Sequence, residues 1–224
     1  SLVGPPVGQS NNRQLNMAFA QTEYAIAWKG LLHSPRLKSL IDTHGYRVTF
    51  LPHLNIEPYL RFFDVPDWIE VHTGATNDSI QTTFQRAQMM ITDYSSVAFE
   101  MALLGRGLLY YQFDRDRIFQ GIHHSREGYF DYERDGFGPV CPDLVTLLDQ
   151  LELALANGGD VDAGYARRAR ESFKWRDGNA CRRTVQAIER LGMQVFAQSA
   201  SQPSTIETIA GEPELLLSHA RTTR

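Results

Sequence analysis

Residues 89–111 read MMITDYSSVAFEMALLGRGLLYY, and this stretch decides the fold. An apolar β-type run ends at Thr92. Ser95 and Ser96 then begin an apolar helix, and a second β-type run follows at 108–111. The order is strand, turn, helix, strand. The first backbone N–H groups of a helix are unpaired and lie at the positive end of its dipole. The hydroxyls of Thr92, Ser95 and Ser96 therefore lie where a phosphate would bind favourably.

The rest of the chain also alternates between strand and helix patterns, which is typical of parallel βαβ units. The fold class is therefore α/β, with a parallel sheet covered by helices on both faces. Pro35 is expected to break the first helical segment in two, and Asp78 or Ser79 is expected to cap a later helix. The predicted strands are 47–51, 69–71, from 89 and 108–111, and the predicted helices are 19–41, 57–63, 79–88, from 95, 144–155, 162–173 and 178–191.

Composition sets limits on domains and partners. The formal net charge of -4 argues against a nucleic-acid-binding protein. Cys141 and Cys181 have no metal-ligand spacing, and the first residues lack the build of a signal peptide, so a reduced cytoplasmic protein without a structural metal is expected. We predict a flexible lead-in at 1–15, one nucleotide-binding lobe at 16–195 and a polar tail at 196–224.

A long segment between the last predicted strand and the closing helices has few aliphatic residues. It runs from Gln112 to Pro142 and is rich in aromatic residues, charges and glycines. This composition favours an ordered active-site loop over a linker. His53 and the Thr92–Ser96 turn both follow strand ends. Ligands bind beyond the carboxyl ends of strands in such sheets, so these two segments are expected to share one rim.

Four separated motifs together resemble the CDP-glycerol glycerophosphotransferase family, which includes teichoic-acid primases and polymerases and related capsule polymerases. They are FLPH at 50–53, TDYSS at 92–96, GYFDYERDGFGP at 128–139 and DGNACRR at 177–183, in the order of the family. The resemblance covers roughly residues 19–192. It implies a GT-B fold of two Rossmann-like lobes, of which this chain supplies the C-terminal, donor-binding lobe.

The resemblance also implies a reaction and its partners. A polyol phosphate, glycerol or ribitol phosphate, moves from a CDP-activated donor to a hydroxyl of a cell-wall or capsule polymer or of a lipid-linked acceptor, and CMP leaves. The family works at the inner face of the cell membrane, attached peripherally. The acceptor-binding lobe and its candidate catalytic histidine have no counterpart here, so the chain is expected to need a missing N-terminal lobe or another chain. Glu100 stands where the family often has Asp.

His53 is the candidate catalytic residue. Its imidazole could take the proton of the attacking hydroxyl or donate to a phosphate oxygen, since imidazole titrates near neutral pH. The simpler interpretation is a histidine that only caps a strand end. No cofactor is assigned, although a divalent cation such as Mg²⁺ could assist.

The substrate-binding candidates come from the turn, the following helix and the loop. Asp93 would be repelled by a diphosphate, so it is expected to orient the turn, contact ribose hydroxyls or help to hold a cation. Arg126 could clamp a phosphate, because a guanidinium group matches phosphate geometry. For Ser95 and Ser96 the simpler interpretation is helix capping. The full set is Thr92, Asp93, Ser95, Ser96, Glu100, Arg126, Tyr129 and Asp131.

Two other functions are compatible with the same residues. The turn would suit any nucleotide diphosphate, so a GT-B lobe that uses a nucleotide-sugar donor is one alternative. A non-catalytic module that binds an acceptor or a partner protein is the other.

Overall fold

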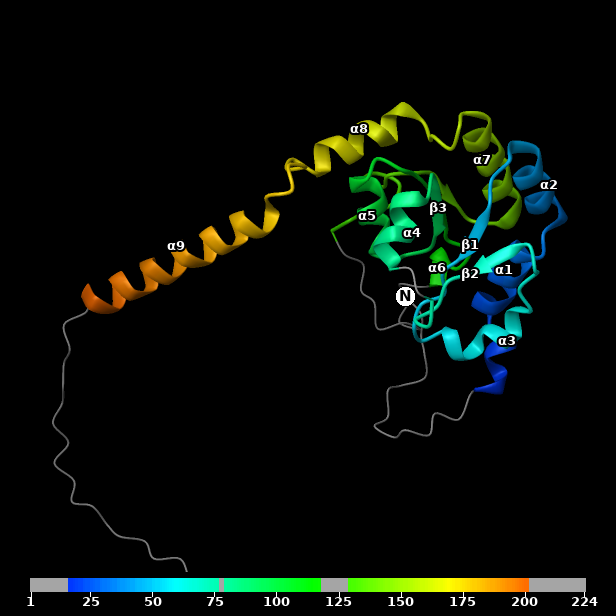
Figure 1. The fold of residues 1–224 in the computed structure, drawn as a ribbon, viewed down its shortest axis with the longest axis horizontal. Coiled ribbons are helices and arrows are strands. Elements are labelled where there is room, and N and C mark those ends of the chain that lie inside the picture. The colour runs from blue at the N-terminus through cyan, green and yellow to red at the C-terminus, as the bar shows by residue number, and fades with distance from the viewer. Residues whose placement is uncertain (1–15, 77–78, 118–128, 202–224) are drawn as a thin grey trace, which may run out of the picture. The chain divides into compact units, whose positions relative to one another are not determined.

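The computed structural model describes residues 16–76, 79–117 and 129–201 (Figure 1). The chain divides into two units, Ser1–Lys174 and Trp175–Arg224. All the strands described lie in the first unit, and the second contains helix α9 (Ala180–Ser201). The predicted lobe boundary near residue 195 stays a prediction.

The strands are parallel, as predicted, and form two hydrogen-bonded sets. β1 (Val48–Phe50) pairs with β2 (Ile69–Val71). β3 (Met89–Thr92), β4 (Gly107–Tyr111) and β5 (Val140–Cys141) form the second set in that order, with β4 in the centre. The fold class is confirmed, although the strands do not make one continuous hydrogen-bonded sheet.

Helices cover both sides of the central strand β4, whose residues are all buried. Leu109 and Tyr111 point to one side, where they pack in a core with α1 (Glu23–Leu32), α2 (Pro35–His44) and α7 (Leu144–Ala156). Leu108 and Tyr110 point to the other side, because side chains alternate along a strand. That second core includes α4 (Ile80–Arg86), α5 (Val97–Leu103) and α8 (Ala163–Ser172).

A third, aromatic cluster lies beside β1 and β2. The ring of Phe19 packs 4.3 Å from that of Tyr59 and 5.9 Å from that of Phe63, measured between ring centroids. Phe50 and Ile69 bring the two strands into the same cluster. The short elements of this region are η1 (Met17–Gln21), η2 (Glu57–Tyr59) and α3 (Leu60–Phe63), and α6 (Arg115–Arg117) follows β4.

Local signals placed several helix ends correctly. α1 ends at Leu32 and α2 begins at Pro35, so the predicted break is confirmed. Ser34 accepts a hydrogen bond from the backbone N–H of Leu37 at the start of α2. Of the two residues considered for the α4 cap, Ser79 fills the position, and its hydroxyl accepts from Thr82 N at 3.2 Å.

Several elements differ from the sequence prediction. α6 and β5 both lie inside the segment 112–142 that was predicted to be loop, because elements this short leave no periodic pattern in the sequence. α9 extends to Ser201 rather than ending at Leu191, since apolar residues continue at helical intervals past Gly192. Within the described ranges, no helix is both long enough and apolar enough to cross a bilayer.

The end of the loop approaches the central strand very closely. A Cβ added to Gly138 would lie 1.8 Å from the carbonyl oxygen of Leu108 and 2.6 Å from its carbonyl carbon. Because both are backbone atoms, they cannot move aside without breaking the β4 pairing. Gly138 therefore allows the loop to return along the sheet before β5.

We expect Gly138→Ala to lower the free energy of unfolding by about 2–3 kcal/mol, because an overpacked buried site must shift its backbone. The matched control is Gly30→Ala on an exposed part of α1, where an added Cβ meets nothing within 4 Å. That change should stabilise the helix by roughly 0.5–1 kcal/mol. Urea unfolding of both variants measures the difference, and equal effects would contradict the close approach.

Candidate functional site

The predicted phosphate turn follows the carboxyl end of β3. Thr92 is buried and lies opposite Tyr110 of β4. Asp93 Oδ1 accepts a hydrogen bond from the backbone N–H of Tyr94 at 2.7 Å, which fixes the first bend of the turn. Ser96, at the other end, is exposed. The turn thus presents its serine end to solvent at the edge of the sheet.

The serines start helix α5 through their backbone, not through their side chains. The carbonyl oxygens of Ser95 and Ser96 accept from Ala98 N at 3.2 Å and from Phe99 N at 3.0 Å. Ser96 has helical dihedral angles and makes no side-chain capping hydrogen bond. Capping therefore does not account for the Ser96 hydroxyl, which is in a position to contact a ligand.

Three phenol groups lie within electrostatic range of Asp93. Burial raises the pKa of Tyr24, Tyr94 and Tyr132, and the negative charge of Asp93 raises each of these three pKa values further. The Tyr94 hydroxyl donates to Asp114 Oδ1 at 3.0 Å. Asp93 therefore lies among side chains from α1, the turn itself and the loop before β5. The sequence analysis missed Tyr24, Asp114 and Tyr132, because no local pattern marks residues that meet only in the fold.

His53 follows β1 and is exposed. Its Nδ1 accepts from the backbone N–H of Asn55 at 3.2 Å, and its carbonyl oxygen accepts from Ile56 N and Glu57 N. In a neutral imidazole whose Nδ1 accepts, the proton is on Nε2. This geometry favours donation to a phosphate oxygen over proton abstraction. Because β1 belongs to the other hydrogen-bonded set, the shared rim with the Thr92–Ser96 turn stays a prediction.

A second histidine, which the sequence analysis missed, follows the neighbouring strand β2. His72 is buried, and its Nδ1 lies 3.0 Å from Thr83 Oγ1 on α4. Its backbone N–H donates to the carbonyl oxygen of Phe50. His72 therefore ties the end of β2 to α4 and to β1.

The loop candidates have different surroundings. Tyr129 is 91% exposed. Asp131 Oδ1 accepts from Glu133 N and Arg134 N, and these bonds, with Arg134 N–H as the largest cause, lower the pKa of Asp131. The Asp131 carboxylate thus builds the turn of the loop. Glu100 is exposed on α5, and Arg126 lies outside the described residues.

The structure brings the turn and the loop together. The ring of Tyr132 in the loop packs edge-on to that of Tyr94 in the turn, with centroids 5.6 Å apart. In the part of the chain that the structure describes, no three His, Cys, Asp or Glu side chains gather in a way that could hold a metal ion.

Residues 21–190 match the protein family described as CDP-Glycerol:Poly(glycerophosphate) glycerophosphotransferase. The chain belongs to this family. The resemblance carried by the four sequence motifs is thereby confirmed, and the match includes the turn, the described part of the loop, and His53.

Two curated relatives and one solved structure are similar to the chain. The chain is 30% identical over 179 residues to the minor teichoic acid biosynthesis protein GgaB of Bacillus subtilis, covering 80% of this chain and 19% of GgaB. It is 28% identical over 116 residues to a teichoic acid glycerol-phosphate transferase of Staphylococcus aureus, covering 50% of this chain and 28% of the relative. A structure of the wall teichoic acid polymerase TagF has the same fold, with a TM-score of 0.50 and 20% identity over 73% of this chain and 40% of TagF. The chain thus spans less than a third of the curated relatives it matches.

The phenol cluster predicts how stability depends on pH. Burial, with a smaller effect of Asp93, raises the pKa of Tyr132 from 10.0 to about 12. Between these values the unfolded chain loses the phenol proton while the folded chain keeps it. The free energy of unfolding should therefore be at its full value below pH 10 and fall as the pH rises towards 12.

Tyr132→Phe should make this fall less steep, since phenylalanine has no proton to lose. Urea unfolding at several pH values, with tyrosinate absorbance as a second signal, measures the slope. The same slope in both proteins would mean that Tyr132 does not titrate differently in the folded state.

Proposed function

We propose that this chain supplies the donor-binding lobe of a glycerophosphotransferase that uses CDP-glycerol or CDP-ribitol. The acceptor is a hydroxyl of a cell-wall or capsule polymer or of a lipid-linked primer, and the complete enzyme works peripherally at the inner face of the membrane. Since the chain covers a minor part of its relatives, the remaining lobe comes from further protein. The proposal rests on the TDYSS turn at residues 92–96 of this chain, which belongs to the family. The Ser96 hydroxyl in this turn makes no capping hydrogen bond.

The proposed reaction is a single displacement at phosphorus. The acceptor oxygen forms a bond to the β-phosphorus of the donor, the bond from that phosphorus to the CMP oxygen breaks, and CMP leaves with the electron pair. The acceptor proton passes to a base or to solvent. Since CMP is already a stable anion, catalysis consists mainly of positioning the reactants and neutralising charge on the phosphate oxygens.

Different residues of the turn would position the donor and neutralise the charge on its phosphates. Ser95, Ser96 and the backbone N–H groups at the start of α5 would donate to the diphosphate, and Thr92 would support them from beneath. Asp93 would be repelled by the phosphates and already accepts a hydrogen bond from the backbone N–H of Tyr94, so it would orient the turn or reach ribose hydroxyls instead. The remaining candidates Glu100, Arg126, Tyr129 and Asp131 would complete the donor contacts from the helix and the loop.

The first test is calorimetric titration of the chain with CDP-glycerol, CDP-ribitol, CMP and UDP-glucose. We expect one of the CDP-polyols to bind at least about tenfold more tightly than UDP-glucose. The double variant Ser95→Ala/Ser96→Ala should weaken that binding by roughly tenfold or more, since charge-assisted hydrogen bonds to phosphate are lost. Ser39→Ala, on the exposed side of α2, is the matched control and should change nothing. Equal or reversed donor preference would favour the nucleotide-sugar alternative.

The second test concerns His53 in the full-length protein. If Nε2 of His53 donates to a phosphate oxygen as charge develops, His53→Ala should lower kcat by about 10²–10³-fold while the donor Kd changes little. His44→Ala, at the end of α2 and before β1, is the control. Near-normal turnover would remove His53 from the mechanism.

The same assay with and without EDTA tests whether Mg²⁺ assists. Donor binding without turnover in the complete wild-type protein would favour the non-catalytic alternative.

A further inference from the structure

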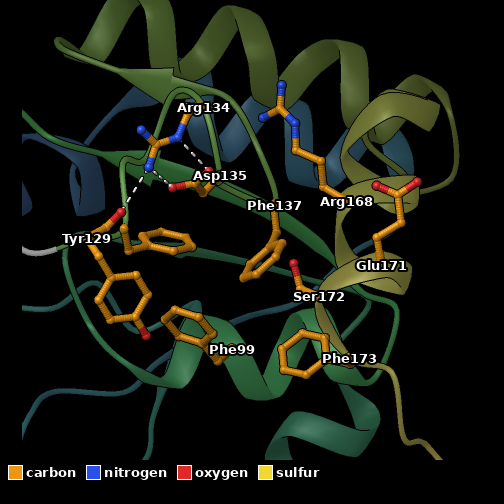
Figure 2. A pocket seen from close by; sticks show the side chains of 10 residues that line it. Phe99, Tyr129, Arg134, Asp135, Phe137, Arg168, Glu171, Ser172 and Phe173 are labelled. Atoms are coloured by element: carbon orange, nitrogen blue, oxygen red, sulfur yellow. Dashed lines mark hydrogen bonds and ion pairs between the residues drawn. The ribbon is translucent and has the colours of Figure 1, made fainter.

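A cavity of about 760 Å³ lies between α5, the loop before β5, and α8. Its size is within the range of ordinary small-molecule sites. Figure 2 shows aromatic rings gathered in its centre and charged side chains around them. The lining residues are Phe99, Tyr129, Phe130, Arg134, Asp135, Phe137, Arg168, Glu171, Ser172 and Phe173.

Phenylalanine rings in mutual contact form the floor of the cavity. The ring of Phe99 lies 5.0 Å from that of Phe130 and 5.4 Å from that of Phe137, between centroids, and Phe137 lies 5.7 Å from Phe173. Phe99 is 37% exposed, whereas Phe137 is only 2% exposed. The ring surface that the fold leaves uncovered therefore comes mainly from Phe99 and from Tyr129, which is 91% exposed.

The charged groups around the floor are held in fixed orientations. The Arg134 guanidinium donates to both oxygens of Asp135 and to the carbonyl oxygen of Tyr129. This contact with Arg134 lowers the pKa of Asp135 to about 2, so the carboxylate stays ionised and can accept hydrogen bonds at any physiological pH. Arg168 donates from Nη1 to the carbonyl oxygens of Glu133 and Gly136. The hydrogen-bonding groups of the rim are thus largely preorganised.

The charged residues that line the cavity indicate which kind of ligand it could bind. Two guanidinium groups, Arg134 and Arg168, are matched by two carboxylates, Asp135 and Glu171. A site for a phosphate or another anion would carry an excess of positive charge, which this rim lacks. A neutral ligand that offers both hydroxyl donors and hydroxyl acceptors would use all four groups.

A sugar ring combines both requirements. Its faces carry C–H groups with weak positive character, which suit the electron-rich faces of aromatic rings. Its edge carries hydroxyls, which can donate to carboxylates and accept from guanidinium groups. We propose that this cavity binds a neutral pyranose unit of the acceptor, an assignment that rests on the proposed transferase function.

The position of the cavity supports an acceptor site next to the donor. The ring of Phe130 in its lining packs 5.2 Å from that of Tyr132, and Tyr132 packs 5.6 Å from Tyr94 in the turn. One layer of side chain therefore separates the cavity from the turn proposed for the diphosphate. A sugar bound in the cavity would therefore bring the acceptor chain close to the side of the turn where Tyr132 packs against Tyr94.

The test is saturation-transfer NMR on the 224-residue chain, with methyl β-D-glucopyranoside as the probe. We expect saturable transfer with a millimolar dissociation constant. Tyr129→Ala and Glu171→Gln should each weaken binding by about tenfold, because each removes one contact at an exposed position that the fold does not need. Leu153→Ala, at an exposed position on α7 away from the cavity, is the control.

Three results would overturn the proposal: no transfer to the pyranoside, transfer that both variants leave unchanged, or displacement of the sugar by inorganic phosphate. Titration of the same samples with CDP-glycerol separates this proposal from the transferase function. Glu171→Gln should keep full donor binding while losing sugar binding. Donor binding without sugar binding in the wild type would remove only the acceptor site, whereas sugar binding without donor binding would remove only the donor site.

Discussion

The parallel pairing of β3 with β4 is the constraint on which the rest of the site depends. The register runs from Met89 opposite Gly107 to Thr92 opposite Tyr110. Every residue of β4 is buried, so a shift of one residue would exchange its two apolar faces between two different cores. The residue after Thr92 must therefore leave the sheet at its carboxyl edge. This is why the turn, and with it the Ser96 hydroxyl, has a defined position.

Elements whose signals are local could be predicted from the sequence. Pro35 cannot continue a helix and Ser79 can cap one, so these boundaries follow from single residues and their neighbours. β5 could not be predicted, because Val140 and Cys141 are a strand only through their pairing with β4. The division of the strands into two hydrogen-bonded sets was missed for the same reason, since hydrogen bonding between strands depends on packing between segments far apart in the chain.

The candidate site divides in the same way. Residues 92–96 were predicted together because they are contiguous, and the structure keeps them together. Tyr24, Asp114 and Tyr132 meet around this turn from separate segments, and composition indicated only that the loop was ordered. The turn-forming role of Asp131 could have been predicted from the local sequence. Aspartate commonly forms turns by accepting hydrogen bonds from backbone N–H groups two and three residues ahead.

The two histidines show that one residue type can have different environments at corresponding places in the fold. His53 and His72 follow neighbouring parallel strands, yet His72 is buried against Thr83 while His53 is exposed. An acceptor bond at Nδ1 leaves the Nε2 proton of His53 available, and a donor in this position can stabilise an anion without first losing a proton. The carboxylate of Asp93, which follows β3, lies within electrostatic range of Tyr94 and Tyr132, and its Oδ1 accepts from the backbone N–H of Tyr94. After each of these two strands, β1 and β3, a local hydrogen bond from the backbone thus orients a polar side chain.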